Sequence, residues 1–423
     1  MPQPFVVILG KAVRYAMRLR GGGSALPGLF VEKISPDFIK NTLAHLPRGV
    51  VVISGTNGKT TTTKMVVALL ESQGLKVFTN RTGSNFTRGV AAALLGDIDI
   101  KGRLDADIAV LELDEAHAVK FVHTIPPRYS LLLNVMRDQL DRFGEIDATA
   151  KMLSAIAQAT TDTVVLNRED RRILAIQDSL KKQKVQFFGL SDELLATFPS
   201  DDDLHNAKVQ KSKRPAAGVI LKEYKDDHAT FTLGTRDVSS TLKLRGIYNV
   251  FNSAAALALT YAIIGDKIDS TAVMKALAEV TPAFGRGEQL RVGDQPLELV
   301  LVKNPSGFRL GLQSFAPEGY ATMIAINDDY ADGRDMSWLW DVDFESLAPS
   351  GVAQVSGVRA YDMALRLQYD EVAIAHIEPD LAGALRQFID VNKDQPKRIY
   401  CTYTAMLALR KELSKITKVE VIS

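Results

Sequence analysis

The sequence has a single cysteine, Cys401, and almost no net charge. One cysteine excludes a disulfide within the chain and any metal site built from several cysteines, and it is typical of a reducing cytoplasm. The 51 lysines and arginines nearly cancel the 50 aspartates and glutamates, so no overall field favours nucleic acid as a partner. The six histidines lack the spacing of metal ligands. No apolar run approaches the roughly 20 residues that cross a bilayer.

The N-terminal segment contains no acidic residue before Glu32. Apolar residues recur at helical spacing between Ile8 and Met17. The charged residues within and just after this stretch, Lys11, Arg14, Arg18 and Arg20, are all basic. This pattern predicts an amphipathic basic helix. Such a helix either packs on the first domain or contacts an anionic membrane surface.

Strand-like apolar runs alternate with helical stretches along the chain. The predicted strands are residues 50–54, 75–79, 108–113, 130–135, 163–166, 297–302, 321–327, 371–375 and 398–402. This rhythm is typical of α/β domains with mostly parallel sheets. Because 423 residues exceed one typical core, we expect more than one domain. The predicted divisions are an N-terminal segment (1–45), a central domain (46–290) with an exposed polar insertion at about 191–217, and a C-terminal domain (291–423).

The stretch "VVVISGTNGKTTTTKMVVALL" predicts a strand, a glycine loop and a helix. The glycines let backbone N–H groups point at an anion, next to the positive end of the helix. Only two residues separate them, whereas the usual phosphate loop has four. The lysine reaches outer phosphates and a threonine hydroxyl reaches Mg²⁺. The predicted nucleotide-phosphate site comprises Gly55, Thr56, Asn57, Gly58, Lys59, Thr60 and Thr61.

Three later stretches add candidate ligands. "AVLELDE" places Glu112 and Asp114 at the end of a strand, where carboxylates are able to hold Mg²⁺. "GIYNVFNSAAAL" places Asn249 and Asn252 at a predicted helix start, where Asn249 either caps the helix or binds a ligand. "FGRGE" places Arg286 near the predicted domain junction.

In this order, the loop, the asparagines and the arginine resemble the Mur ligase superfamily of ATP-dependent amide-forming enzymes. Five further stretches look like the MurT family of lipid II isoglutaminyl synthase subunits: "GGGSALPGLFVEKISPDF", "NRTGSNFTRG", "MRDQLDRFGE", "VKNPSGF" and "NDDYADGRDMSWLWDVDFE". The resemblance covers nearly the whole chain. It implies a Mur-ligase-type central domain with a phosphate loop and a mostly parallel sheet, followed by a Rossmann-like α/β C-terminal domain.

The resemblance also implies a reaction. ATP phosphorylates the α-carboxylate of D-glutamate in lipid II, and ammonia attacks the acyl phosphate to give D-isoglutamine. Lys59 and Thr60 would take the ATP phosphates and Mg²⁺, Glu112 would serve the metal, Asn252 would contact the nucleotide, and Arg286 would approach the phosphates. Phosphoryl transfer needs cations and in-line positioning, which these residue types supply.

Ammonia requires a second chain. Hydrolysis of glutamine needs a nucleophile, and Cys401 lies in a predicted strand as a buried apolar thiol. The family uses a glutaminase partner of the GatD type, to which MurT lends an aspartate that orients a histidine. The matching residue is Asp335, whose alternative role is to cap a helix at 336–339. We expect a heterodimer in the cytoplasm that meets lipid II at the inner membrane face.

The chain departs from the family pattern at two places. The insertion lacks the four cysteines of a zinc ribbon that many members carry, so we predict no zinc. The superfamily's metal-binding histidine is Gln139 here, and Lys151 is out of register for a carbamylated lysine, so a second metal is not predicted. Two other functions remain open: an amino-acid-adding ligase like folylpolyglutamate synthase, and an ATP-binding regulatory subunit without turnover.

Overall fold

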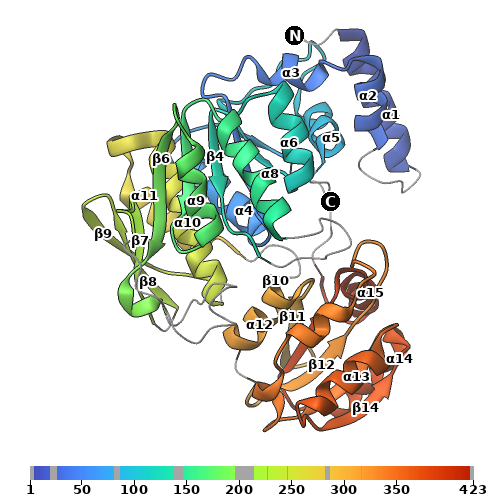
Figure 1. The fold of residues 1–423 in the computed structure, drawn as a ribbon. Helices are drawn as coiled ribbons and strands as arrows, with labels where there is room; N and C mark the ends of the chain where they lie inside the picture. The colour runs from blue at the N-terminus through green and yellow to red at the C-terminus, as the bar shows by residue number, and fades with distance from the viewer. Residues whose placement is uncertain are drawn as a thin grey trace. The chain divides into compact units, whose positions relative to one another are not determined.

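The computed structural model describes residues 4–19, 26–80, 86–136, 146–195, 214–225, 227–244, 246–281, 286–315 and 317–419, without the side chains of Ala16, Arg18, Leu19 and Arg286. The chain divides into two compact units, which are drawn in Figure 1. The first comprises Met1–Val135, Asp147–Leu244 and Asn249–Val280, and the second comprises Met136–Ile146, Arg245–Tyr248 and Thr281–Ser423.

The first unit is built on a sheet whose described strands run in the order β2-β3-β1-β4-β5-β6-β7-β8-β9. Its first seven strands are parallel, and β8 and β9 continue it in antiparallel fashion. The strands are β1 Val50–Ser54, β2 Val77–Thr79, β3 Ile108–Glu112, β4 Tyr129–Leu132, β5 Thr163–Asn167, β6 Lys184–Leu190, β7 Val219–Lys225, β8 His228–Leu233 and β9 Arg236–Thr241.

Burial explains why these residues form these strands. Every residue of β1, β3 and β5 is buried, as expected for parallel strands covered on both faces. Strand β8 instead alternates buried with more exposed residues, which is typical of an antiparallel strand with one wet face. The sequences of the central strands are therefore continuously apolar and easier to recognise than those of the antiparallel edge strands.

Helices cover this sheet, and α6, α8 and α9 lie over one of its faces (Figure 1). Helices α1 and α2 lie side by side and both pack on α5. The helical elements are α1 Pro4–Leu19, α2 Leu26–Ile34, α3 Phe38–Leu43, α4 Lys59–Ser72, α5 Thr87–Asp97, α6 Glu115–Thr124, α8 Ile146–Ala159, α9 Arg171–Ala175, η1 Ile176–Ser179, η2 Asp192–Leu194, α10 Ile247–Ile264, η3 Gly265–Lys267 and α11 Ser270–Glu279.

Helix α10 begins at Ile247, five residues before the start predicted at Asn252, so Asn249 lies in its first turn and is not its N-cap. With η3 it forms a 21-residue stretch that is long and apolar enough, by length and composition, to cross a membrane. The prediction that no run approaches this length was wrong, because the helix continues through its few polar residues. However, 67% of its most apolar window is buried inside the protein, as in the core helix of a globular domain.

The second unit has its own sheet, in which the described strands run in the order β10-β11-β15-β12-β13-β14. All neighbours are parallel except β10 and β11. The strands are β10 Arg286–Val292, β11 Gln295–Leu301, β12 Ala321–Ala325, β13 Val352–Ser356, β14 Ile374–Glu378 and β15 Lys397–Cys401. The helical elements are α12 Pro305–Ser314, η4 Ser337–Asp341, η5 Glu345–Leu347, α13 Ala360–Tyr369, α14 Leu381–Val391 and α15 Tyr403–Leu413.

Apolar clusters lie on both faces of the second sheet. One contains Phe308 of α12 and Met363 of α13, and the other contains Phe388 of α14 and Met406 of α15. Alternate residues of one strand, such as Tyr400 and Cys401, enter opposite clusters, as the pleat of a strand requires. This is the doubly wound arrangement expected of a Rossmann-like domain.

The predicted fold class, two α/β parts with mostly parallel sheets, is confirmed. The predicted boundary at residues 290 and 291 falls inside β10, a strand that pairs with β11 of the second sheet. The predicted N-terminal segment corresponds to α1, α2 and α3. Most of the predicted insertion lies outside the described residues.

Candidate active site

The candidate site is centred on the loop between β1 and α4. Gly55 and Gly58 have φ angles of 133° and 88°, in the region that side chains disfavour. The loop is tied to Asn134, which follows β4. The Thr56 N–H donates to the Asn134 carbonyl at 3.0 Å, and the Asn57 N–H donates to Asn134 Oδ1 at 2.9 Å. Asn134 therefore fixes the loop's path before any ligand arrives.

Asn252 brings α10 to the same loop. A Cβ atom added to Gly58 would lie 2.6 Å from Asn252 Oδ1, closer than such atoms approach. Asn252 is buried, so the amide and the glycine are packed against each other. The structure thus brings Asn252 to the loop, and Gly58 is the residue that makes room for it, while the contact of Asn252 with a nucleotide stays a prediction.

Lys59 is buried rather than facing solvent. Its Nζ donates to the Gly55 carbonyl at 2.5 Å, and it lies 3.6 Å from a carboxylate oxygen of Glu115 on α6. Its side chain is 9% exposed and that of Glu115 is 4% exposed. An ammonium held this way sits at the inner edge of the loop with a carboxylate as counter-charge, so Lys59 contributes to folding as well as to any anion site.

Thr60 and Glu112 form the acidic side of the site. The Thr60 hydroxyl donates to Glu112 Oε1 at 2.7 Å. Glu112 ends β3, and its backbone is held by the side chain of Asn80 through hydrogen bonds of 2.8 and 3.0 Å. A hydroxyl and a carboxylate in contact are both ligands that Mg²⁺ accepts, and Thr60 lies in the first turn of α4, the helix end that attracts phosphate.

The donor set fits a nucleotide with Mg²⁺. The buried Thr61 Oγ1 has no hydrogen-bond partner among the residues that the structure describes. Buried polar groups are normally satisfied, so this hydroxyl is available to a ligand. Within the same residues no group of three or more His, Cys, Asp or Glu side chains that could hold a metal ion occurs.

Sequence reasoning missed three residues of this site: Asn80, Glu115 and Asn134. Each follows the end of a parallel strand, namely β2, β3 and β4. Because carboxyl ends of parallel strands meet at one edge of the sheet, position alone could have identified them.

Asp170 lies at the same edge, where it caps α9. Its carboxylate accepts the N–H groups of Val135 at 2.7 Å, of Arg172 at 2.9 Å and of Ile173 at 3.0 Å. Removal of the carboxyl from water raises the pKa of Asp170 to about 6, although these N–H groups act in the opposite direction. Its contacts are those of a structural cap.

In the second unit, Asp335 lies just ahead of η4. Its Oδ1 accepts the Ser337 N–H at 2.9 Å, and hydrogen bonding to the Ser337 side chain, together with this backbone bond, lowers the pKa of the carboxyl below its ordinary value. Met336 is the N-cap residue of η4 and no side-chain hydrogen bond caps this helix, so Asp335 does not have the alternative capping role, and its side chain remains partly exposed. Asp332 is buried instead and accepts the Thr404 N–H at 2.8 Å, which anchors the turn to the start of α15. The anchored turn therefore holds an ionised carboxylate at the surface.

Two segments quoted for the resemblance, "VKNPSGF" and "NDDYADGRDMSWLWDVDFE", begin at the carboxyl ends of β11 and β12 in the second sheet. Asn304, after β11, caps α12 by accepting the Gly307 N–H at 2.7 Å. Asn327, after β12, donates its N–H to Thr402 Oγ1 at 2.8 Å. Asp328 pairs with Arg359 at 2.7 Å. Arg286 opens β10 of this unit, and its role toward the phosphate loop stays a prediction.

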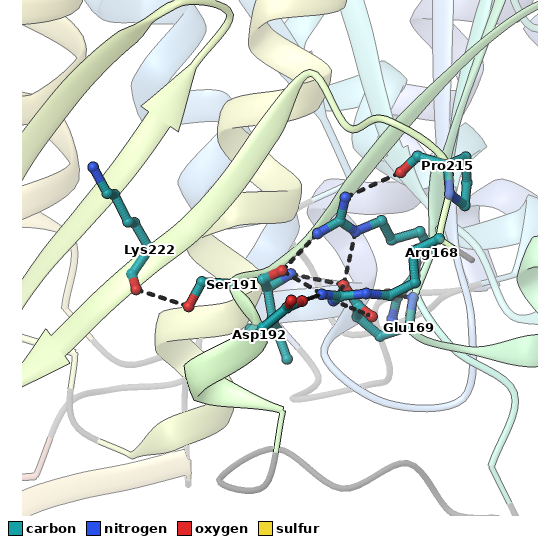
Figure 2. A network of polar contacts seen from close by, with 9 residues as sticks. Arg168, Glu169, Ser191, Asp192, Pro215 and Lys222 are labelled. Carbon is teal, nitrogen blue, oxygen red and sulfur yellow. Dashed lines mark hydrogen bonds and ion pairs between the residues drawn. The ribbon is translucent and has the colours of Figure 1, made fainter. Parts of the chain in front are cut away.

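A polar network closes the base of the insertion (Figure 2). Glu169 Oε1 accepts from Arg168 at 2.9 Å and from Arg214 at 2.9 Å, and Arg214 also pairs with Asp192. Arg168 donates to the Pro215 carbonyl at 3.0 Å. The two flanks of the insertion are therefore joined by ion pairs and hydrogen bonds. The cysteine-free segment for which no zinc was predicted lies mostly outside the described residues, as does Gln139, while Lys151 is exposed on α8.

Comparisons with known proteins agree with this architecture. The description "Mur ligase middle domain" matches residues 53–260, and "MurT ligase C-terminal" matches residues 301–406. A Streptococcus pneumoniae protein named lipid II isoglutaminyl synthase (glutamine-hydrolyzing) subunit MurT is 30% identical, over 96% of this chain and 96% of its own.

Among solved structures, MurF ligase from Thermotoga maritima, in complex with ADP, has a TM-score of 0.68 at 18% identity and covers 91% of this chain and 84% of its own. E. coli FolC, in complex with DHPP and ADP, has a TM-score of 0.63 at 14% identity and covers 90% of this chain and 92% of its own. At these identities the two structures support the fold alone. The full-length similarity and the two matched domains together show that the chain belongs to the MurT family of the Mur ligase superfamily.

Proposed function

We propose that this chain is the synthetase subunit of a lipid II isoglutaminyl synthase. An oxygen of the D-glutamate α-carboxylate of lipid II attacks the γ-phosphorus of ATP, giving an acyl phosphate and ADP. The nitrogen of ammonia then attacks the acyl carbon, phosphate leaves, and D-isoglutamine remains. One combined observation carries the proposal: both units match the family, and the first unit has an intact phosphate loop.

The loop residues have separate roles in this proposal. The backbone N–H groups between Gly55 and Gly58, with the N-terminal end of α4, bind phosphate oxygens. Lys59 lies at the loop's inner edge and offsets charge on the outer phosphates. Thr60, Thr61 and Glu112 would hold Mg²⁺, which when bound neutralises phosphate charge. Asn252 and Asn249 of α10 are proposed to contact the nucleotide, and Arg286 to act on the phosphates.

Ammonia is proposed to come from a glutaminase partner of the GatD type. The thiol of Cys401 is buried, and burial raises its pKa well above the ordinary range, so it is unsuited to attack glutamine. The related protein's name contains both "glutamine-hydrolyzing" and "subunit", which supports a division of labour. Asp335 is proposed to orient a histidine of the partner, because its ionised carboxylate is partly exposed. The reaction is proposed to take place in the cytoplasm, because it consumes ATP.

The two half-reactions make the proposal testable. The Asp335→Asn complex is expected to lose amidation with glutamine, by up to the roughly 10⁴-fold typical of an orienting aspartate, and to retain it with concentrated ammonium at alkaline pH. A variant that lacks Lys59 is expected to fail with both nitrogen sources. The measurement is ADP release and amide formation with lipid II and the assembled complex.

Each other result has a definite meaning. Loss of the ammonium reaction in an assembled Asp335→Asn complex would assign Asp335 to the ATP site. Full activity with glutamine would leave Asp335 only its local hydrogen bond with Ser337. ADP release that requires an added amino acid instead of ammonia would favour a folylpolyglutamate synthase-like ligase, and no ADP release would favour a regulatory subunit.

A further inference from the structure

Helix α1 is held firmly along one side. Val6 and Val7 are buried, and a Cβ atom added to Gly10 would lie 2.7 Å from Leu95 of α5 and 2.7 Å from Val31 of α2. Such close packing fixes which side of the helix faces inward. The side that faces outward is therefore a fixed feature of the first unit.

The outward side of α1 is apolar. Phe5 is 70% exposed, Ile8 is 57% exposed and Tyr15 is 68% exposed, and Ala12 between them is exposed as well. Their spacing of three, four and three residues places them in one row along the helix. Contiguous exposed apolar side chains on a globular protein mark a surface that something covers.

The charges on α1 itself have one sign. Lys11 and Arg14 lie on the same helix, three residues apart, and the sequence has no acidic residue before Glu32. Glu32 itself, on α2, interacts electrostatically with Arg88. The Arg14 guanidinium lies over Gly96 of α5. Lys11, one turn from Ile8 and Tyr15 of the apolar row, suits an anionic surface with an apolar interior.

A lipid surface satisfies both halves of this chemistry. An interfacial helix buries its apolar row at the acyl boundary and places its cations among anionic headgroups. A second copy of the chain satisfies only one half, because a symmetric pair would bring two basic helices together and like charges repel. We propose that the outward row of α1, Phe5, Ile8, Ala12 and Tyr15, docks the protein on an anionic membrane surface.

Because few residues take part, docking through α1 should be reversible. Only a few apolar side chains would insert into the membrane, and each basic residue near an anionic surface raises the affinity about fivefold. The binding should therefore be weak, and salt should reduce it. Docking of this kind would hold the protein close to membrane-bound molecules without a spanning helix. It does not depend on the amidation reaction, so the two proposals fail separately.

Sedimentation of the full-length protein with lipid vesicles that contain no lipid II tests the inference. Vesicles of equal parts phosphatidylglycerol and phosphatidylcholine are compared with vesicles of phosphatidylcholine alone. We expect binding at least about tenfold stronger to the anionic vesicles, and a decrease as salt rises. The double variant Ile8→Ser/Tyr15→Ser is expected to bind at least about tenfold more weakly than the wild type.

A matched control has the same kinds of residues elsewhere. Tyr361 (67% exposed) and Leu365 (48% exposed) lie on α13 of the second unit, and the variant Tyr361→Ser/Leu365→Ser should bind vesicles like the wild type. Both double variants should have the melting temperature of the wild type, because the replaced side chains are exposed. Equal binding by wild type and Ile8→Ser/Tyr15→Ser, or no preference for anionic vesicles, would overturn the inference. A wild-type dimer that this variant converts to monomer would assign the row to a second copy instead.

Discussion

Replacing Lys59 by alanine removes a buried ammonium as well as a phosphate ligand. Lys59 Nζ faces a Glu115 oxygen at 3.6 Å, and both side chains are less than 10% exposed, at 9% and 4%. The variant therefore leaves a buried carboxylate without the cation that faces it. Two effects should follow from one substitution, and they are separable.

The structure sets the size of the stability effect. Removal of one member of a buried ion pair costs about 3–5 kcal/mol, and the 3.6 Å separation places this pair near the lower end, at about 3 kcal/mol. For a unit of this size the melting temperature of the first unit should fall by about 6–12 °C. The second unit does not contain the pair, so its transition should stay in place.

A second variant separates folding from phosphate binding. In Lys59→Ala/Glu115→Gln the buried group is neutral, so most of the lost stability should return while ATP-dependent turnover stays absent. Glu115→Gln alone serves as the control, since it keeps the lysine. The assays are thermal unfolding, and ADP release with lipid II and ammonium.

Two results would refute the reasoning. An unchanged melting temperature of Lys59→Ala would show that Lys59 and Glu115 do not form a buried pair. Amidation at the wild-type rate by a variant without Lys59 would show that the loop is not the phosphate site.

Two further predictions concern single positions. Gly58→Ala should lower the free energy of unfolding by about 1–2 kcal/mol through left-handed backbone strain, and further through the clash with Asn252. Calorimetry should also show weaker ATP binding by this variant. Gly74→Ala, at φ of 81° but with nothing within 4 Å, should show the effect of strain alone. Equal losses would show that Gly58 does not need its space. Cys401 should resist thiol reagents at neutral pH until the protein unfolds, because burial raises its pKa, and stoichiometric labelling of the native protein would contradict its position in β15.

The loop was predictable because its signal is local. Gly55, Gly58 and Lys59 lie within five residues, between an apolar run and a helical stretch, and φ > 0 at both glycines follows from the turn that they make. The partners that complete the loop are distant in sequence: Asn134 is 77 residues from Asn57. Their approach depends on strand order, β3-β1-β4, which sequence pattern does not specify.

Other parts carried weaker signals. Strands β7, β8 and β9 contain many polar residues, because one face of this edge of the sheet is exposed to solvent. Their sequences therefore do not resemble those of the apolar central strands. Burial of Lys59 was missed because a charged residue in a glycine loop is expected at the surface, and its partners Glu115 and the Gly55 carbonyl, which make the burial tolerable, are visible only in the structure. Arg286 and Asp335 were selected by resemblance, which identifies residues but not their surroundings.

Oxygen transfer tests the central proposal most directly. Lipid II labelled with ¹⁸O in the α-carboxylate of D-glutamate is amidated by the assembled complex with ATP and ammonium, and the released phosphate is analysed by mass spectrometry. An acyl phosphate requires that one ¹⁸O leave with the phosphate for each amide formed, while the other stays in the amide. Amide formation with unlabelled phosphate would contradict the proposal, because the carboxylate oxygen would then never have been bonded to phosphorus.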